Sequence, residues 1–530
     1  MNAVSTSSAP PQSTDANEKF LFWACFIALV ATAFGFMIRG ELLDTWGREF
    51  GLNEVEKGQI NGVGVWPMGV SIVLFSLVID KIGYGRAMLF AFAAHITYAV
   101  IVISAPSLIP MFHAKHAGYW VLYVGNLIFA LGNGTVEAVI NPVVATMFSR
   151  QKTKWLNVLH AGWPGGLVAA GLLTIAIGTA DWRLKVACIF LPVLVYGGMM
   201  LRCKFPLNER VAAGASYRDM LGEFGILGAL IVLSLIIREM LGNDFGFSNT
   251  VQLAVGAVAL IAFGLAARSL GRPMLIFLLL IMIPLATTEI GTDGWITSLM
   301  KPEMERLGAN AAWVLVYTSF IMMILRFSAG PIVHRISPLG LLAISSAVAA
   351  CGLFFLSKSA GFTILAAATV YGFGKSFFWP TMLGVVSERF PKGGALTLNA
   401  TGGVGMLGVG VLGFPLIGLL QENVVREKLN PAVYQQVSTV KEGVFGEYQA
   451  VDPDKVKLLS SEESKEVTTI ADEGKKGALA TMAIFPCIML VCYLILIAYF
   501  RAKGGYQAEV LAGHAADDSK FTGGVEGPVE

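Results

Sequence analysis

Long apolar runs constrain the fold of this chain more than any other feature. About fourteen segments are long and apolar enough to cross a bilayer as helices, which needs roughly 20 residues each. Charged residues make up only 14% of the chain, against roughly 25% in soluble domains. The sequence therefore predicts an all-α polytopic membrane protein. The expected spans are about 20–44, 58–79, 87–105, 118–148, 154–178, 185–201, 224–240, 250–267, 273–298, 311–333, 339–357, 361–387, 394–420 and 478–500.

Lysine and arginine in the short loops predict the orientation, because cytoplasmic loops are enriched in these residues. Every second loop is basic: Lys81 and Arg86; Arg150, Lys152 and Lys154; Arg202 to Arg218; Arg268 and Arg272; Arg335; Arg389 and Lys392; Arg501 and Lys503. The alternate loops are poorer in basic residues, and the 104–117 loop has only Lys115. We therefore expect a multi-pass protein of the plasma (inner) membrane with both termini in the cytoplasm.

An internal repeat divides the chain into two related halves. Gly134–Pro142 and Gly372–Pro380 have the same glycine-to-proline spacing, and Glu137 and Lys375 each lie five residues before the proline. Repeated halves with Gly- or Pro-interrupted helices are typical of secondary transporters.

The repeat predicts the domain organisation, in which two six-helix bundles flank an inserted hairpin. The expected parts are a cytoplasmic tail (1–19), an N-terminal six-helix bundle (20–201), a cytoplasmic linker with an extra transmembrane hairpin (202–272), a C-terminal six-helix bundle (273–500) and a second cytoplasmic tail (501–530). Residues 421–476 are expected to form a solvated extracytoplasmic loop or small helical cap.

A single carboxylate lies deep in the fourth apolar run. Asn133, Glu137 and Asn141 are spaced by four, which places them on one face of a helix. The nearest cation along the chain is Arg150, about 20 Å away at the helical rise per residue. An ionisable residue at that depth is expected to face a cavity and to have a function. We expect Glu137 to carry a proton, while the two amides hold solute hydroxyls or orient the acid.

Other polar residues inside the apolar runs are candidate substrate contacts. Lys375 is a second intramembrane cation, expected to pair with Glu137 or Glu289. Glu289 and Asp293 share a helix face and are expected to bind substrate or gate the outer mouth.

The helices that follow the repeated motif add further candidates. His160 lies three residues after Asn157, so both side chains can face one cavity, and Asn399 occupies the position that matches Asn157 in the repeat. Trp379 is expected to stack on a sugar ring.

Three charged residues are expected to control gating. Asp80 and Arg86 lie at the cytoplasmic end of the second helix, where a carboxylate and a basic loop can lock the inner gate. Arg326 lies at the corresponding end in the second half and is assigned the same role.

These motifs resemble the major facilitator superfamily. The segment from Asp80 to Arg86 is similar to its Gly-x-x-x-Asp-Arg-x-Gly-Arg-Lys signature, sharing Asp80, Gly83 and Arg86 but lacking the leading glycine. The segment from Glu137 to Pro142 resembles the Glu-x-x-x-Asn-Pro run of the fucose/galactose/glucose–proton symporters.

Two more segments carry the same resemblance. Leu156–His160 is similar to the Leu-Asn-x-x-Gln stretch of these symporters, with His160 replacing the glutamine, and Phe378–Thr381 is similar to their aromatic-Pro-Thr turn. The resemblance implies the two-bundle fold, a sugar substrate and proton coupling. It also implies an acidic residue in the first helix, for which Glu41 and Asp44 are the nearest candidates, with Arg39 alongside.

Transport of another solute, enzyme activity and sensing are the alternatives to proton-coupled sugar transport. The same fold can carry a nucleoside, an organic anion or a drug, although an anion carrier is expected to show more cavity Arg or Lys. An integral-membrane enzyme needs a catalytic motif or a metal cluster, but the six histidines are scattered. A sensor needs a cytoplasmic signalling domain, and the tails are short. We therefore predict no enzyme activity, cofactor or metal.

The expected partners follow from the predicted class of protein. They are a small-molecule substrate, most simply a sugar, with protons and the lipid bilayer. A net charge of +2 gives no nucleic-acid footprint, and a monomer is expected because no oligomeric signal is visible.

Overall fold

The apolar runs are helical in the computed structural model, which describes residues 15–52, 54–108, 111, 117–333, 335–443, 445–509 and 511. Among the described residues, twelve helices are long and apolar enough to cross a membrane. The two remaining predicted spans are occupied by the shorter α16 (Ala312–Phe327) and by the pair α19 (Thr363–Lys375) and α20 (Phe378–Arg389). The prediction of about fourteen spans in an all-α membrane protein is confirmed.

The elements fall into two halves with an insertion between them. The first half contains α1 (Asp15–Phe50), α2 (Glu54–Val63), α3 (Trp66–Ile82), α4 (Tyr84–Ile103), α5 (Ala105–Leu108), α6 (Ala117–Met147), α7 (Lys152–His160), α8 (Gly162–Ile177), α9 (Trp182–Ala187) and α10 (Phe190–Met200). The insertion contains α11 (Glu209–Ala212), α12 (Tyr217–Ile237), a π-helical turn (Arg238–Asp244) and α13 (Asn249–Ala267).

The second half begins with α14 (Pro273–Ala286), a π-helical turn (Thr287–Gly291), α15 (Thr292–Arg306) and α16. It continues with α17 (Ala329–Val333), α18 (Pro338–Lys358), α19, α20, a 3₁₀ turn (Pro391–Gly393), α21 (Gly394–Gly408), a π-helical turn (Val409–Gly413), α22 (Phe414–Lys428), α25 (Ser461–Met482) and α26 (Ile484–Ala502). Between α22 and α25 lie α23 (Pro431–Val437), β1 (Ser438–Gly443), β2 (Gly446–Val451) and α24 (Pro453–Val456).

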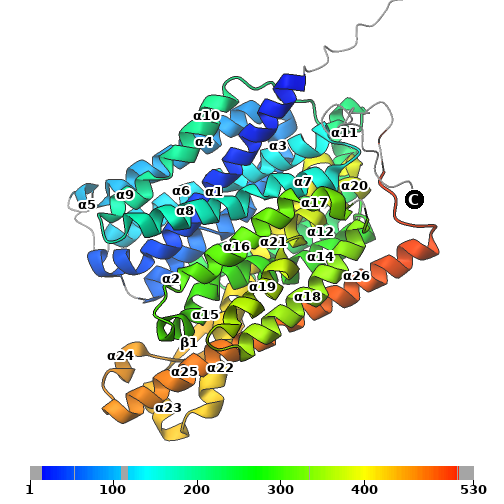
Figure 1. The fold of residues 1–530 in the computed structure, drawn as a ribbon. Helices are drawn as coiled ribbons and strands as arrows, with labels where there is room; N and C mark the ends of the chain where they lie inside the picture. The colour runs from blue at the N-terminus through cyan, green and yellow to red at the C-terminus, as the bar shows by residue number, and fades with distance from the viewer. Residues whose placement is uncertain are drawn as a thin grey trace, which may run out of the picture.

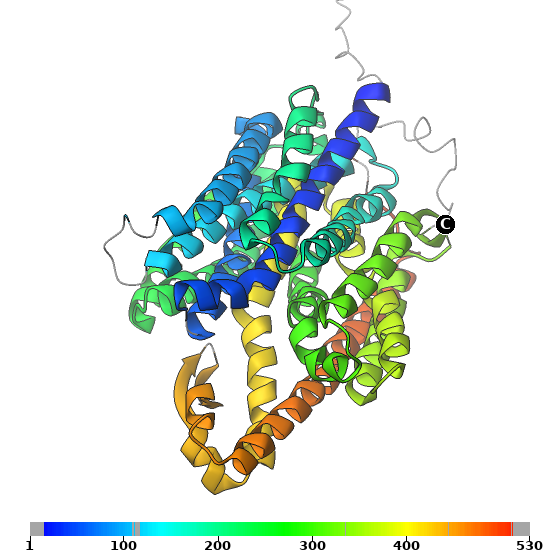
Figure 2. The ribbon, with the colours of Figure 1, turned by 60° about the vertical axis from the view of Figure 1, so that its left-hand side comes forward.

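The two halves lie side by side, and the two ends of the molecule differ (Figure 1). The helix α1 begins and α26 ends at one end, which we call the terminus side. The far ends of α22 and α25 project from the other end, which we call the loop side (Figure 2). The inserted helix α12 packs on α14 and α21 of the second half, and α13 packs mainly on α12. The insertion is therefore peripheral, as a hairpin added to a six-plus-six arrangement should be.

The segment 421–476 is more ordered than the expected loop or cap. α22 and α25 continue past the bundle as long helices, and β1 pairs with β2 in an antiparallel hairpin with Ser438 opposite Val451. The extension has its own small apolar core, which contains Val425, Tyr434 and Val467. The hairpin was not predicted, because the alternation of apolar residues in two six-residue strands is too short to stand out beside long apolar helices.

Several spanning helices are interrupted, and these breaks expose backbone groups inside the molecule. α2 ends and α3 begins around Gly64 and Val65, and α19 gives way to α20 at Ser376. The π-helical turn Thr287–Gly291 interrupts the span that contains α14 and α15. By contrast, α6 runs unbroken through Pro142. The repeat is therefore imperfect, since the matching helix of the second half is broken before its proline.

The two halves approach each other closely where glycines of α3 and α21 face each other. A Cβ atom added to Gly69 of α3 would lie 2.9 Å from the carbonyl oxygen of Gly403 of α21. A Cβ atom added to Gly403 would lie 2.7 Å from a methyl group of Val73. Small residues allow such contacts between membrane helices, where packing replaces the hydrophobic effect.

A substitution at this crossing is expected to weaken the contact between the halves. Gly403→Leu should lower the midpoint of thermal unfolding in detergent, because overpacking costs about 1–3 kcal/mol. Gly198→Leu in α10 is the matched control, since open space surrounds that position. Equal midpoints for the two variants would contradict the close approach of α3 and α21.

Candidate functional site

A chain of buried polar groups begins at Glu137 on α6. The carboxyl group is 3% exposed, and its Oε2 accepts a hydrogen bond of 2.7 Å from Asn141 Nδ2. Asn141 Oδ1 lies 2.9 Å from His160 Nε2. Because the Asn141 amide nitrogen donates to Glu137, its oxygen must accept, so His160 Nε2 carries the proton. Three of the predicted site residues thus lie together in the first half.

Arg326 of α16 extends this chain across the boundary between the halves. The side chain is 1% exposed, and its Nη1 donates to the backbone carbonyl of His160 at 3.0 Å. Its Nη2 pairs with Glu289 Oε1 at 2.6 Å, and its Nε donates to the Ser376 carbonyl at 2.6 Å. One guanidinium therefore joins the end of α7, a π-helical turn and the break between α19 and α20.

Lys375 forms a second buried ion pair in the second half. Its ammonium group is fully buried, pairs with Asp293 and lies 3.4 Å from Thr318 Oγ1. The expected pairing of Lys375 with Glu137 or Glu289 is wrong. Glu289 is paired with Arg326 instead. The Glu137 carboxyl is held by the amide of Asn141, which lies on the same helix of the first half.

Trp379 lies beside this cluster and lines neither of the two loop-side cavities described below. Its backbone N–H donates to Glu289 Oε2 at 3.1 Å, and its ring is 3% exposed. A Cβ atom added to Gly405 of α21 would lie 2.8 Å from the ring, so the indole packs into the second half. The aromatic stacking expected of it is not provided in this conformation.

Two repeat-related asparagines form reciprocal bonds between the halves. Asn157 of α7 donates to Thr381 Oγ1 of α20 at 3.1 Å, and Asn399 of α21 donates to the Ala138 carbonyl of α6 at 2.9 Å. In the described structure the amide oxygens of Asn157 and Asn399 are both buried without a hydrogen-bond partner. The central interface therefore holds two unused acceptors at related positions.

Asn133 is bound within the first half. Its Oδ1 lies 3.0 Å from His95 Nε2, and His95 Nδ1 lies 3.0 Å from the Tyr196 hydroxyl. Sequence reasoning missed His95, because a single histidine in an apolar helix carries no pattern. Its signal would have been the helix face that it shares with Ala91, Tyr98 and other buried residues of α4.

A cavity of about 830 Å³ opens between the halves on the loop side. Glu41 and Asn61 line it from the first half, and Asp293 lines it from the second. Glu41 pairs with Lys185 at 2.5 Å at the same wall. Asp293, the partner of Lys375, thus lies at the wall of the cavity, whereas Glu137, which was expected to face one, is enclosed. The Asp44 side chain lies outside the described residues.

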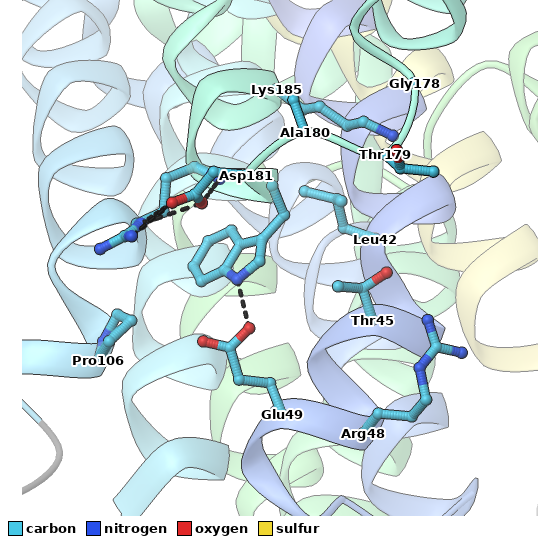
Figure 3. Close-up of a pocket in the computed structure, with 12 residues that line it drawn as sticks. Leu42, Thr45, Arg48, Glu49, Pro106, Gly178, Thr179, Ala180, Asp181 and Lys185 are labelled. Carbon is cyan, nitrogen blue, oxygen red and sulfur yellow. Dashed lines mark hydrogen bonds and ion pairs between the residues drawn. The ribbon is translucent and has the colours of Figure 1, made fainter.

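A second cavity of about 620 Å³ lies further out on the loop side of the first half. Thr45, Arg48 and Glu49 rise from α1 on one side of it, and Asp181 and Lys185 approach from the other (Figure 3). The indole N–H of Trp182, which also lines this cavity, donates to Glu49 Oε2 at 2.5 Å. Lys185 lines both cavities.

The terminus side of the first half is closed by ion pairs. Asp80 pairs with Arg210 of the linker, and Lys152 pairs with Glu209 at 2.7 Å. Arg86, expected to act with Asp80, is exposed and has no ion pair in the described part of the chain. The basic partner of Asp80 therefore comes from the linker, which folds back beneath the bundle, and not from the adjacent loop.

Hydrogen bonds also join the two halves on the terminus side. Lys152 donates to the Ser387 carbonyl at 3.1 Å, and Thr153 donates to Glu388 Oε1 through its backbone and its hydroxyl. The segment after α26 reinforces this contact, because the Tyr506 hydroxyl donates to Glu388 Oε2 at 2.8 Å. Burial and the neighbouring Glu388 carboxylate raise the pKa of the Tyr506 hydroxyl well above its usual value, so it remains a donor.

The described structure is thus open between the halves on the loop side and closed on the terminus side. Within it, no group of three or more His, Cys, Asp or Glu side chains is arranged to hold a metal ion. The site is a buried polar chain beneath a one-sided cavity, which suits the binding of a polar solute and the movement of a proton.

The ion pair between Arg326 and Glu289 is expected to be strongly coupled. Arg326→Gln leaves a buried carboxylate without its cation, which typically costs about 3–5 kcal/mol, and should lower the unfolding midpoint markedly. Adding Glu289→Gln should restore part of the loss. Arg306→Gln, at a 68% exposed side chain paired with Glu303, should change the midpoint little. Strictly additive effects of the two single substitutions would contradict the coupling.

Comparisons with known proteins agree with this architecture. The sequence model of the Major Facilitator Superfamily matches residues 24–413. A search of curated proteins returns no match.

Among solved structures, the human organic anion transporter MFSD10 (TETRAN) is 11% identical, with a TM-score of 0.58 over 90% of this chain and 99% of that one. The Escherichia coli fucose:proton symporter FucP is 14% identical, with a TM-score of 0.54 over 89% and 98%. The proton:xylose symporter XylE, bound to 6-bromo-6-deoxy-D-glucose, is 12% identical, with a TM-score of 0.57 over 92% and 96%. At these identities the structures show a shared fold, and with the family match they lead to one conclusion: the chain belongs to the major facilitator superfamily.

Proposed function

We propose that this transporter moves a monosaccharide together with protons by alternating access. The observation that carries the proposal is the buried acid Glu137, in a structure whose cavity between the halves opens on one side only. Hydrogen bonds through Asn141 and His160 link this acid to Arg326 of the second half. In this proposal both termini lie in the cytoplasm, so the loop-side cavity faces outward. The domains in this proposal are the N-terminal bundle (20–201), the linker with the inserted hairpin (202–272) and the C-terminal bundle (273–500).

Glu137 is the acid best suited to take up a proton. The buried carboxylates Glu289 and Asp293 each have a cationic partner, but Glu137 is held by the neutral amide of Asn141. A buried carboxylate without a cation is costly, and protonation removes that cost. Release then requires a change in its surroundings, which opening toward the other side of the membrane would supply.

The solute site proposed for a sugar lies between the halves. The unused amide oxygens of Asn157 and Asn399 can each accept a hydrogen bond from a hydroxyl group, and sugars carry many such donors. A cavity of about 830 Å³ is within the usual range for small-molecule sites. Two neighbours in fold are symporters of fucose and xylose with protons.

Closure on the terminus side supplies the second element of the mechanism. Glu388 holds Thr153 of the first half and Tyr506 of the C-terminal segment at once. We infer that this joint must break for the solute to leave on the cytoplasmic side. Asp80 and Arg210 are proposed to act with it, because they fix the linker under the first bundle.

The proton role of Glu137 is tested by uptake into proteoliposomes, with labelled hexoses and nucleosides supplied with and without an imposed proton gradient. We expect a hexose to accumulate only with the gradient. Glu137→Gln should reduce that accumulation at least tenfold while leaving solute exchange at equal concentrations, because the amide cannot carry a proton. Glu462→Gln, at an exposed residue of α25, is the control. Unchanged gradient-driven accumulation in Glu137→Gln, or accumulation of nucleosides alone, would refute the proposal.

The role of Glu388 is tested by thiol labelling. A cysteine introduced as Ser387→Cys is buried at the closed interface, and we expect Glu388→Gln to increase its labelling rate several-fold by weakening the joint. Glu427→Gln, on the loop side, should leave the rate unchanged. If both variants label at the rate of the parent, Glu388 does not hold the terminus side closed.

A further inference from the structure

One buried cation of this protein has no acidic partner. Six lysine and arginine side chains are buried in the described part of the chain: Arg39, Lys152, Lys185, Arg210, Arg326 and Lys375. Five of them form ion pairs: Lys152 with Glu209, Lys185 with Glu41, Arg210 with Asp80, Arg326 with Glu289, and Lys375 with Asp293. Arg39 is the exception, although it is only 1% exposed.

The guanidinium of Arg39 is held by neutral groups alone. Its Nε donates to Asn61 Oδ1 and its Nη1 to the Gly64 carbonyl, both at 3.3 Å, which is long for bonds from a charged donor. Its Nη2 has no hydrogen-bond partner in the described structure. Gly64 permits this packing, because a Cβ atom there would lie 1.9 Å from Nη1. The charge is therefore neither neutralised nor fully hydrogen-bonded.

A second unsatisfied polar group belongs to the same site. Tyr98 of α4 lies near this part of α1, because its ring packs on Phe129, which a Cβ atom added to Gly35, one turn before Arg39, would meet at 2.0 Å. Tyr98 is 1% exposed, and its hydroxyl likewise has no hydrogen-bond partner in the described structure. An arginine nitrogen and a tyrosine hydroxyl are both hydrogen-bond donors. Two hydrogen-bond donors without acceptors, beside one positive charge, are suited to bind an anion and not a cation.

This site lies directly behind the wall of the loop-side cavity. Asn61, which accepts from Arg39, itself lines that cavity, and so do Phe36 and Gly40 on either side of Arg39 in α1. Asn61 belongs to α2, which ends just before the break at Gly64. A solute in the cavity therefore needs to displace one amide side chain to reach the guanidinium.

We propose that Arg39 binds the carboxylate of an acidic monosaccharide, a hexuronate-like solute, which takes the place of Asn61. This inference rests on the proposed transport of monosaccharides and names their class more closely. A single carboxylate matches the one uncompensated positive charge, whereas a phosphate dianion would leave a negative charge unpaired. Arginine and carboxylate also fit as a two-bond pair. Among the described residues of the second half, the buried cations Arg326 and Lys375 are both paired with carboxylates.

The proposal is tested by ligand-induced shifts of the thermal unfolding midpoint of the purified full chain, without any proton gradient. The probes are sodium glucuronate, glucose and sodium chloride at equal concentration. We expect glucuronate to raise the midpoint of the parent protein by several degrees more than glucose or chloride does. Arg39→Gln should abolish this difference, Arg39→Lys should retain part of it, and Arg426→Gln, at an exposed arginine of the extension, should retain all of it.

Three results would overturn the inference. Glucuronate and glucose could stabilise the parent equally, Arg39→Gln could keep the full glucuronate shift, or chloride alone could give the whole Arg39-dependent shift, which would indicate an inorganic ion. If Arg39→Gln does not fold, Asn61→Ala provides the decision, because removing the competing amide should increase the glucuronate shift, and an unchanged shift would refute the proposal. Failure of the transport mechanism itself would appear separately, as absent gradient-driven uptake despite Arg39-dependent binding.

Discussion

The contact of Arg326 with both halves is the interaction on which the central site depends. A guanidinium has five N–H donors in a fixed plane, and here they serve three backbone or side-chain acceptors on separate interrupted elements. The His160 and Ser376 carbonyls are free to accept because Pro164 and Pro380, four residues further along the chain, have no N–H group to donate within the helix. Losing this one side chain would leave Glu289 charged and buried, with the His160 and Ser376 carbonyls less well satisfied.

The two halves differ in whether their buried charged groups have charged partners. In the second half, the buried cations Arg326 and Lys375 are paired with Glu289 and Asp293. In the first half, an acid and a base are each left without a charged partner: Glu137 is bound by an amide and Arg39 by an amide and a carbonyl. Uncompensated groups are those whose charge state or partner can change at low cost. In the proposed mechanism both of these groups have a role: Glu137 takes up the proton and Arg39 binds the solute carboxylate.

The contacts at the two ends explain why only one side is open. On the terminus side, short polar bonds link α7 to α20 and reach the segment after α26. On the loop side, Glu41 and Lys185 pair within the first half and do not bridge to the second. Between these ends, the glycines of α3 and α21 allow the two halves to pack closely against each other.

The sequence by itself determined the class of fold, the number of spans, the two-fold repeat and the deep position of Glu137, because apolar length and helical spacing are local properties. The i,i+4 bond between Asn141 and Glu137 follows from that spacing. Only the tertiary structure decided which charges pair, since Lys375 lies 82 residues from Asp293 and ion pairing depends on how the interrupted helices cross. The same holds for Arg39: it lies alongside Glu41 in the sequence, but the helix turns its guanidinium inward while Glu41 lines the cavity. Chain position cannot reveal that a buried cation lacks a partner, because this is a property of everything packed around it.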